Sequence, residues 1–243
     1  MKNPKIILLA AFAILLAPAA YSQKWKNWGI GIKGEGPIIR KELKLEPFTG
    51  LELAMSGNVY LREGNKQSVT VESHKNIIEV IHTEVLNNTW KIHFSKSVRG
   101  YQKMNIYVTL PSLHKLAVSG SGNIRGETPF NWKGTVKLAV SGSGDMQLEL
   151  HSTEVDAAIS GSGDIRITGT SGRLQAAISG SGNIHAGGLV VDTASISISG
   201  SGDCSTHARN DLDVKISGSG DVTYYGKPKV HSKIVGSGNI IPK

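Results

Sequence analysis

A five-residue motif, Ser-Gly-Ser-Gly followed by Asn or Asp, recurs along the second half of the chain and constrains the fold more than any other feature. The complete copies are Ser119–Asn123, Ser141–Asp145, Ser160–Asp164, Ser179–Asn183, Ser199–Asp203 and Ser217–Asp221. A seventh copy, Val235–Asn239, lacks only the first serine, and a shorter relative, Ser56-Gly57-Asn58, lies far upstream. The last glycines of successive copies are 18 to 22 residues apart. A period near 20 residues indicates one structural unit repeated along an axis.

The residues around the motif alternate in character as they would in a β-strand. A β-branched residue precedes each copy and, in most copies, an aliphatic residue follows it, as Val118 and Ile124 do in the first copy. Counting in twos between these apolar positions, both glycines fall on the inward side, and both serines and the Asn or Asp fall on the outward side. An inward glycine allows the wall to bend sharply or another backbone to approach closely.

These features predict an all-β fold, a single-stranded parallel β-helix with 18–22 residues per coil. A coil of that length has a perimeter on the order of 60–70 Å, which suits three faces, and neighbouring coils would pair in parallel about 4.8 Å apart. Handedness does not follow from the period alone. The irregular coil lengths and the lack of a strict six-residue apolar repeat favour a right-handed helix.

We expect residues 48–243 to form the β-helix domain, with the seven motif coils in residues 116–243 and N-terminal strands forming a cap in residues 48–115. Short runs of alternating apolar and polar residues predict half-buried strands in the cap. Asn87-Asn88 lies between two such runs and predicts a hairpin turn. Asn76–Ile81 fits either a short helical turn or the start of a strand. Pro242 would blunt the open edge of the last coil.

The first 22 residues are predicted to be a cleavable signal peptide, followed by a loosely structured leader over residues 23–47. Lys2 and Lys5 precede an apolar run from Ile6 to Leu16, and small residues then offer cleavage after Ala20 or Ser22. The apolar run is short for a membrane anchor, which takes about 20 residues. The mature protein is therefore expected to be exported to the periplasm, the outer membrane or the cell surface, with no later transmembrane segment.

The glycine-serine motif resembles that of a known family. The repeated Gly-Ser-Gly followed by Asn or Asp and an aliphatic residue, together with Phe48–Leu53 and Ser56–Val59, is similar to the head "GIN" domain of auto-transporter adhesins common in Bacteroidetes. The resemblance covers about residues 48–243. It implies a right-handed β-helix, an exported or surface location and an adhesive role. It transfers no catalytic residue.

The reactive side chains of the repeat favour structural roles over catalytic or metal-binding ones. The outward serines form ladders, but His151, His185, His207 and His231 fall in different columns, so no base accompanies them. The outward Asn/Asp column favours turn residues that bond nearby backbone over a calcium site, whose candidate ligands would be Asp145, Asp164, Asp203 and Asp221. Cys204, the only cysteine, lies in an inward column and is expected to be a buried, unreactive thiol.

The function predicted from the sequence is that of an exported, non-enzymatic adhesin-like domain that binds a glycan or a cell-surface protein, with no cofactor. The formal charge is +8, and cleavage would remove two lysines and no acidic residue. Nucleic acid is excluded as a partner by export, few aromatic residues and the lack of a nucleic-acid-binding module. A carbohydrate-active lyase or hydrolase and a structural envelope scaffold remain the alternatives, and the oligomeric state is left open.

Overall fold

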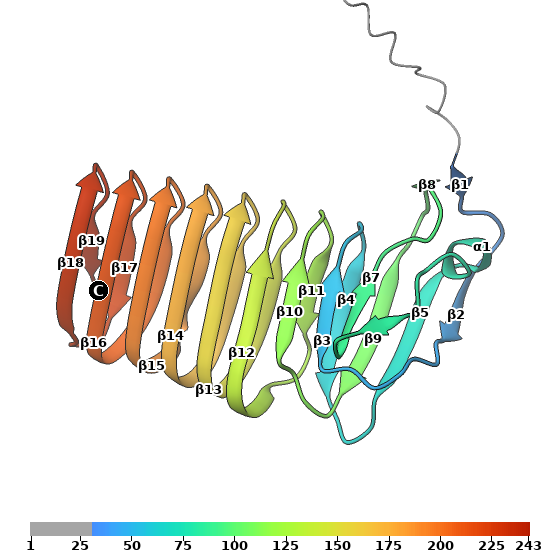
Figure 1. The fold of residues 1–243 in the computed structure, drawn as a ribbon, viewed down its shortest axis with the longest axis horizontal. Coiled ribbons are helices and arrows are strands. Elements are labelled where there is room, and N and C mark those ends of the chain that lie inside the picture. The colour runs from blue at the N-terminus through green and yellow to red at the C-terminus, as the bar shows by residue number, and fades with distance from the viewer. Residues whose placement is uncertain (1–30) are drawn as a thin grey trace, which may run out of the picture. The chain divides into compact units, whose positions relative to one another are not determined.

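The computed structural model describes residues 31–243, so the predicted signal peptide lies outside the described residues. The fold is a β-solenoid of stacked parallel coils, which confirms the predicted fold class (Figure 1). Long strands form the regular part of the stack: β12 (Phe130–Val140), β13 (Met146–Gly161), β14 (Ile165–Gly180), β15 (Ile184–Gly200) and β16 (Cys204–Gly218). Each pairs in parallel with the next along most of its length.

The register of these pairs places equivalent residues of the repeat directly above one another. Ile159 pairs with Ile178, Ser160 with Ser179 and Gly161 with Gly180, and the next interface repeats the pattern. Each inward column therefore becomes a buried ladder of aliphatic side chains in one continuous core. A one-residue slip would expose the whole ladder, so the apolar pattern determines the register.

Each coil consists of two strand segments that run in opposite directions, which we call its legs, and a short third side formed by the motif. In β14, the first part of the strand descends from one motif copy and the last part rises to the next copy (Figure 1). The rising legs lie in front in Figure 1 and the coils advance from right to left, which is a right-handed winding. The three sides are therefore present but unequal, because the glycine-rich side is short.

The glycines of the motif face the backbone of the preceding coil, as the alternation predicted. A Cβ at Gly163 would lie 2.1 Å from the carbonyl oxygen of Gly144, and a Cβ at Gly182 would lie 2.1 Å from that of Gly163. In most copies the first glycine also requires a backbone conformation that other residues rarely adopt; Gly180, for example, has a φ of +136°. The serines of the motif are exposed.

The cap does not follow the chain order. β3 (Gly50–Leu53) and β4 (Asn58–Glu63) form one coil, which pairs on one side with β10 (Lys115–Val118) and β11 (Asn123–Gly126). On its other side it pairs with β7 (Thr89–Ile92) and β9 (Asn105–Leu110), which come later in the chain. The coil that is first in sequence is therefore second in space. A sequence repeat alone predicts that coils stack in the order in which they occur along the chain, and the cap departs from that order.

The remaining cap elements extend the sheet beyond the outermost coil, which is formed by β7 and β9. β5 (Ser68–His74) pairs antiparallel with β9, and β2 (Ile38–Glu42) pairs antiparallel with β5. β6 (Val85–Leu86) and β7 form a hairpin whose turn residues Asn87 and Asn88 both have positive φ, which confirms the predicted turn. Of the two structures that fit the sequence around Asn76, the helical one is present, as the short helix α1 (Lys75–Ile78). β1 (Ile32–Lys33) pairs with β8 (Val98–Gly100).

β1 and β2 belong to the stretch expected to be a loosely structured leader. Most of the β2 residues are exposed, so the strand shows no apolar alternation by which a sequence could reveal it. Its position is determined by backbone pairing with β5 and by the ion pair of Arg40 with Glu72.

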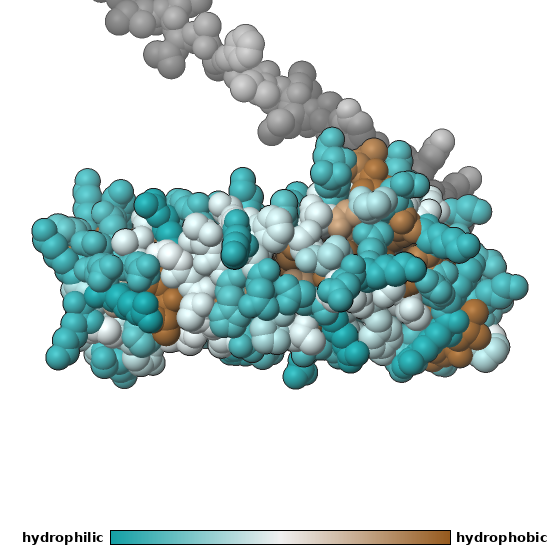
Figure 2. Space-filling view, turned by 90° about the horizontal axis from the view of Figure 1, so that it is seen from below, coloured by the Kyte–Doolittle hydropathy of each residue, from teal (hydrophilic) through white to brown (hydrophobic). Residues whose placement is uncertain are grey.

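The opposite end of the stack is formed by β17 (Val222–Tyr225), β18 (Lys229–Gly236) and β19 (Ile240–Pro242). Every residue of β18 is exposed, including Val230, Ile234 and Val235. Lys229 and Lys233 on the same strand, and Pro242 on β19, are residue types that discourage further strand pairing. Elsewhere the surface seen in Figure 2 is mostly polar or made of small residues, with only small, separate hydrophobic patches.

Candidate binding site on the outer face of the cap

The Asn/Asp column forms a hydrogen-bonded ladder along the outer face of the coils. The Oδ1 atom of each residue accepts the backbone N–H of its counterpart in the next coil, at 3.0 Å from Asp145 to Asp164 and 2.8 Å from Asp203 to Asp221. The same bond recurs at every step from Asn123 to Asn239. The side chains thus satisfy turn N–H groups, which is the structural role that the sequence favoured.

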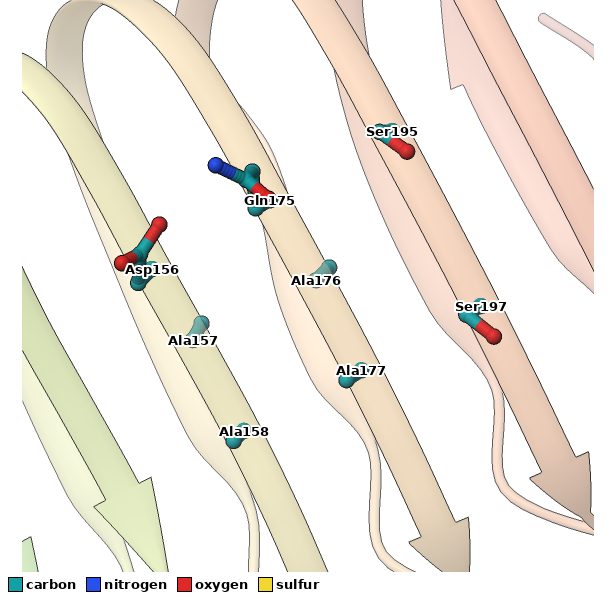
Figure 3. A pocket seen from close by; sticks show the side chains of 8 residues that line it. All are labelled: Asp156, Ala157, Ala158, Gln175, Ala176, Ala177, Ser195 and Ser197. Atoms are coloured by element: carbon teal, nitrogen blue, oxygen red, sulfur yellow. The ribbon is translucent and has the colours of Figure 1, made fainter.

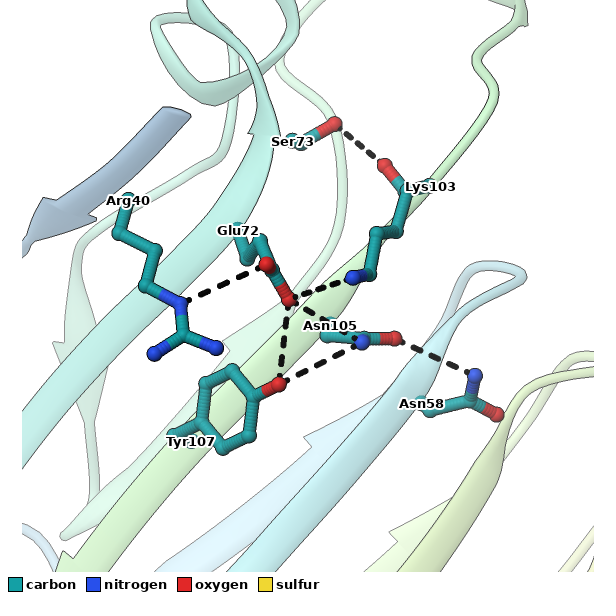
Figure 4. A network of polar contacts seen from close by, with 7 residues as sticks. All are labelled: Arg40, Asn58, Glu72, Ser73, Lys103, Asn105 and Tyr107. Atoms are coloured by element: carbon teal, nitrogen blue, oxygen red, sulfur yellow. Dashed lines mark hydrogen bonds and ion pairs between the residues drawn. The ribbon is translucent and has the colours of Figure 1, made fainter. Parts of the chain in front are cut away.

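The ladder continues into the cap, where it ends on a carboxylate. The Asn123 side-chain amide donates to Asn58. Asn58 in turn donates to Asn105, and Asn105 donates to Glu72 at 3.3 Å (Figure 4). Glu72 also accepts from the Tyr107 hydroxyl at 3.1 Å and pairs with Lys103 at 3.0 Å and Arg40 at 3.4 Å. Each amide in this series of hydrogen bonds donates toward Glu72. A negatively charged acceptor at the end of the series strengthens the hydrogen bond that it accepts.

The four aspartates named as candidate calcium ligands lie in this ladder. Asp145 and Asp164 are neighbours, Asp203 and Asp221 are neighbours, and Asn183 separates the two pairs. One carboxylate oxygen of each aspartate is occupied by a backbone N–H. Within residues 31–243, no group of three or more His, Cys, Asp or Glu side chains could hold a metal ion. That the column binds no calcium stays a prediction.

Replacing Asp203 by alanine is expected to lower the free energy of unfolding by about 1–2 kcal/mol, because the N–H of Asp221 loses its acceptor. The matched variant Asp203→Asn keeps an Oδ1 acceptor and removes only the charge, so it should remain close to the wild type. Urea unfolding followed by circular dichroism distinguishes the two. Equal losses in both variants would mean that the charge, not the hydrogen bond, stabilises the ladder.

The surroundings of Glu72 lower its pKa from the ordinary value of 4.5. The hydrogen bond from Lys103 is the largest cause, followed by that from Tyr107 and by the charges of Lys103 and Arg40, while burial acts in the opposite direction. A lowered pKa in the folded state means that Glu72 stabilises the fold above pH 4.5, and that this contribution is lost as the pH falls through the folded-state pKa.

We therefore expect Glu72→Gln to lower stability at neutral pH by about 1 kcal/mol, with the difference from wild type shrinking as the pH falls below the ordinary carboxyl range. Unfolding curves between neutral pH and acid check this. Glu79→Gln is the control, since Glu79 is exposed and pairs only weakly with Lys75 at 4.0 Å. A difference between Glu72→Gln and wild type that is independent of pH would rule out the assigned role of the charge.

The rising legs present a flat face of small side chains, which we call the alanine–serine face. It consists of Ala139, Ala158, Ala177 and Ser197 in one column, with Ser160, Ser179 and Ser199 beside them. A shallow depression on this face is lined by Asp156, Gln175 and Ser195 together with small residues (Figure 3). The side chains of the alanine–serine face are mostly short and do not converge on one point. This face therefore offers a wide contact area but few polar groups that could recognise a specific ligand.

A second depression, of about 390 Å³, lies on the outer face of the cap, and we call it the tyrosine–arginine pocket. Its lining side chains come from strands β2, β4, β5 and β9: Arg40, Tyr60, Arg62, Ser68, Thr70, Tyr107 and Thr109, with Val108, and Glu127 beyond β11. Tyr60 and Tyr107 are register partners whose rings stack at 5.2 Å between centroids and 16° between planes. Arg40 lies over the Tyr107 ring at 5.1 Å.

Both arginines of the pocket are positioned by carboxylates through Nε. Arg62 Nε donates to Glu127 at 2.5 Å, and Arg40 Nε pairs with Glu72 at 3.4 Å. Neither arginine forms an Nη hydrogen bond within the described part of the chain. Their side chains are 65% and 61% exposed, so two guanidinium edges are available to a ligand.

The residues weighed as catalytic do not form a reactive set. The motif serines are exposed in separate coils, and His151 bonds Thr170 at 2.8 Å while His185 lies 3.7 Å from Asp164. Cys204 is buried as expected, and burial, with a smaller effect of Asp203, raises the pKa of its thiol to about 12.

The pocket was not predicted from the sequence, because the lining residues come from strands that only the folding of the cap brings together. The one available signal was the pair of tyrosines at equivalent outward positions of two predicted strands, Tyr60 in Val59–Leu61 and Tyr107 in Met104–Leu110. Nothing in the linear pattern indicated that these strands are adjacent.

The fold and this arrangement of glycines agree with comparisons to known proteins. Residues 47–228 match the family model described as putative auto-transporter adhesin, head GIN domain. The chain therefore belongs to this family, as the motif resemblance implied. The family's description points to a surface-binding role and to an extracellular or surface location.

Solved structures of similar proteins support the same assignment. A putative adhesin from Bacteroides fragilis is 26% identical, with a TM-score of 0.81, and the match covers 88% of this chain and 100% of that one. Two proteins from Parabacteroides distasonis are each 25% identical with a TM-score of 0.72. One is a putative adhesin, with coverage of 88% and 100%, and the other a putative lipid binding protein, with coverage of 87% and 99%. No curated protein matches the chain.

Proposed function

We propose that the protein is an exported, non-enzymatic adhesin-like protein that binds a ligand on a cell or matrix surface through the outer face of the cap. The observation that carries the proposal is the tyrosine–arginine pocket, whose donors are held in place by Glu72 and Glu127 before any ligand arrives. Preorganised donors reduce the cost of binding. The alanine–serine face would add broad, less selective contact along the rigid stack.

Binding is favoured over catalysis by the electrostatics of the same pocket. A general acid or base for glycoside chemistry needs a carboxyl whose pKa is raised toward neutrality. The pKa of Glu72 is lowered instead, and Glu127 is paired with Arg62. No helix of residues 31–243 is long and apolar enough to cross a membrane.

The proposal is tested by adding the purified protein, fluorescently labelled, to a glycan array, to bacterial and epithelial cells, and to anionic lipid vesicles. Saturable binding to a glycan or to cells is the expected result. Product formation from the bound glycans would favour the carbohydrate-active alternative. Binding to vesicles alone would favour lipid recognition, as the name of one P. distasonis relative suggests. Binding to none of these surfaces would contradict the proposal.

A further inference from the structure

We infer that the tyrosine–arginine pocket recognises a carboxylated sugar unit, such as a hexuronate in a surface polysaccharide. This inference rests on the proposed surface-binding function and names its ligand class. It depends on three properties of the pocket: two available guanidinium edges, a stacked pair of tyrosines, and hydroxyl groups in the lining.

The two guanidinium groups supply the acidic selectivity. Arg40 and Arg62 each use Nε to bind a protein carboxylate, which orients the remaining Nη edge and leaves it open to solvent. An arginine edge with two parallel N–H groups matches the two oxygens of a carboxylate. Because Glu72 and Glu127 already engage the Nε atoms, a ligand carboxylate would meet fixed donors instead of flexible side chains.

The stacked tyrosines supply a surface for the sugar ring. Tyr107 is held by its hydroxyl bond to Glu72 and by the guanidinium of Arg40 above it. Tyr60 stacks on Tyr107, and its own hydroxyl forms no hydrogen bond among residues 31–243. Because Arg40 and Tyr60 cover the Tyr107 ring, the stacked pair offers rigid apolar ring edges, against which the apolar face of a pyranose ring can pack. The pocket volume of about 390 Å³ admits a small ligand of this kind.

The surrounding side chains favour a saccharide over an apolar ligand. Ser68, Thr70 and Thr109 line the pocket with hydroxyl groups that can both donate and accept hydrogen bonds. Arg125 is the register partner of Tyr60 on β11, is exposed, and has no ion pair with any described residue, so it adds positive charge on that side. The one aliphatic lining residue, Val108, is itself buried in the core, so the pocket exposes no aliphatic side chain.

The test measures binding of trigalacturonate and of the neutral galactose trisaccharide to the full protein by isothermal titration calorimetry. Wild type should bind the acidic trisaccharide at least tenfold more tightly than the neutral one. Arg62→Ala should weaken acidic binding by roughly tenfold or more, because a charged hydrogen-bonding edge is lost. Tyr60→Ala should weaken it severalfold, and Tyr60→Phe should bind like wild type because the ring is kept.

Arg166→Ala is the matched control. Arg166 is also exposed on the outer face, and its replacement by alanine removes the same charge, but it lies on β14 outside the pocket. It should change acidic binding by less than about twofold, since it is not at the pocket. Thermal unfolding of every variant confirms that the fold is intact.

Equal losses in Arg166→Ala and Arg62→Ala would overturn the inference, because net charge would then explain the binding. Equal affinity for the acidic and neutral trisaccharides would also overturn it, as would an absence of saccharide binding by a protein that binds anionic vesicles. If wild type binds cells or other glycans and the pocket variants bind them equally well, the pocket inference fails while the proposed function stands. If wild type binds no surface at all, both fail.

Discussion

Replacing Trp90 by alanine is expected to lower the free energy of unfolding by about 3–5 kcal/mol, among the largest effects of any single substitution in the chain. Trp90 is fully buried, lies 5.8 Å from Phe48 between ring centroids, and donates from Nε1 to the carbonyl oxygen of His82 at 2.9 Å. Its removal leaves a large cavity beside Phe48 in the core of the cap. Urea unfolding followed by far-ultraviolet circular dichroism measures the loss.

Trp90→Phe is the matched variant for this prediction. It keeps an aromatic ring against Phe48 but loses the hydrogen bond to His82, so its loss should be clearly smaller than that of alanine. In a repeat protein, coils stabilise their neighbours, so a weakened cap should also lower the melting temperature of the motif coils. An alanine variant as stable as wild type would show that Trp90 does not stabilise the cap.

Replacing Gly163 by alanine is expected to destabilise the middle of the stack by about 3 kcal/mol, the upper end of what overpacking usually costs. The new Cβ would lie 2.1 Å from the carbonyl oxygen of Gly144 and 2.9 Å from a methyl group of Val140. The nearest atom belongs to the backbone of the preceding coil, so the two coils must separate and weaken the pairing between them. The melting temperature and the urea midpoint should both fall.

Gly100→Ala is the control for the Gly163 variant, because both replace glycine by alanine. A Cβ at Gly100 would meet nothing within 4 Å, and Gly100 has no positive φ. Its stability should be unchanged or slightly raised, since alanine reduces the freedom of the unfolded chain. If Gly163→Ala were as well tolerated as Gly100→Ala, close approach between coils would not be the reason for the glycine column.

The regular part of the fold was predictable from the sequence, because each column of the repeat has one physical role. Inward aliphatic residues form the core ladder, inward glycines allow close backbone approach, and outward Asn and Asp bond the turn N–H groups. The buried state of Cys204 and the hairpin turn at Asn87 and Asn88 follow from equally local patterns. Local periodicity is sufficient where each coil contacts only its neighbours in sequence.

The candidate site could not be predicted in this way, since long-range pairing creates it. Tyr60 and Tyr107 meet only because β9 returns to the outer side of β4. Glu72 ends the ladder only because β5 pairs antiparallel with β9, and Arg40 reaches Glu72 from a strand with no apolar pattern. Residues far apart in the chain carry no shared period that would reveal such contacts.

The sequence by itself determined that this chain is a stack of β-coils with a glycine-lined turn, because a 20-residue repeat and a two-residue alternation leave few other ways to bury its aliphatic side chains. The tertiary structure alone decided the order of the coils in the cap, the carboxylate at which the ladder ends, and the pocket beside it. These depend on which strand edges pair after the chain leaves its repeat, and backbone pairing is open to many strands of similar composition.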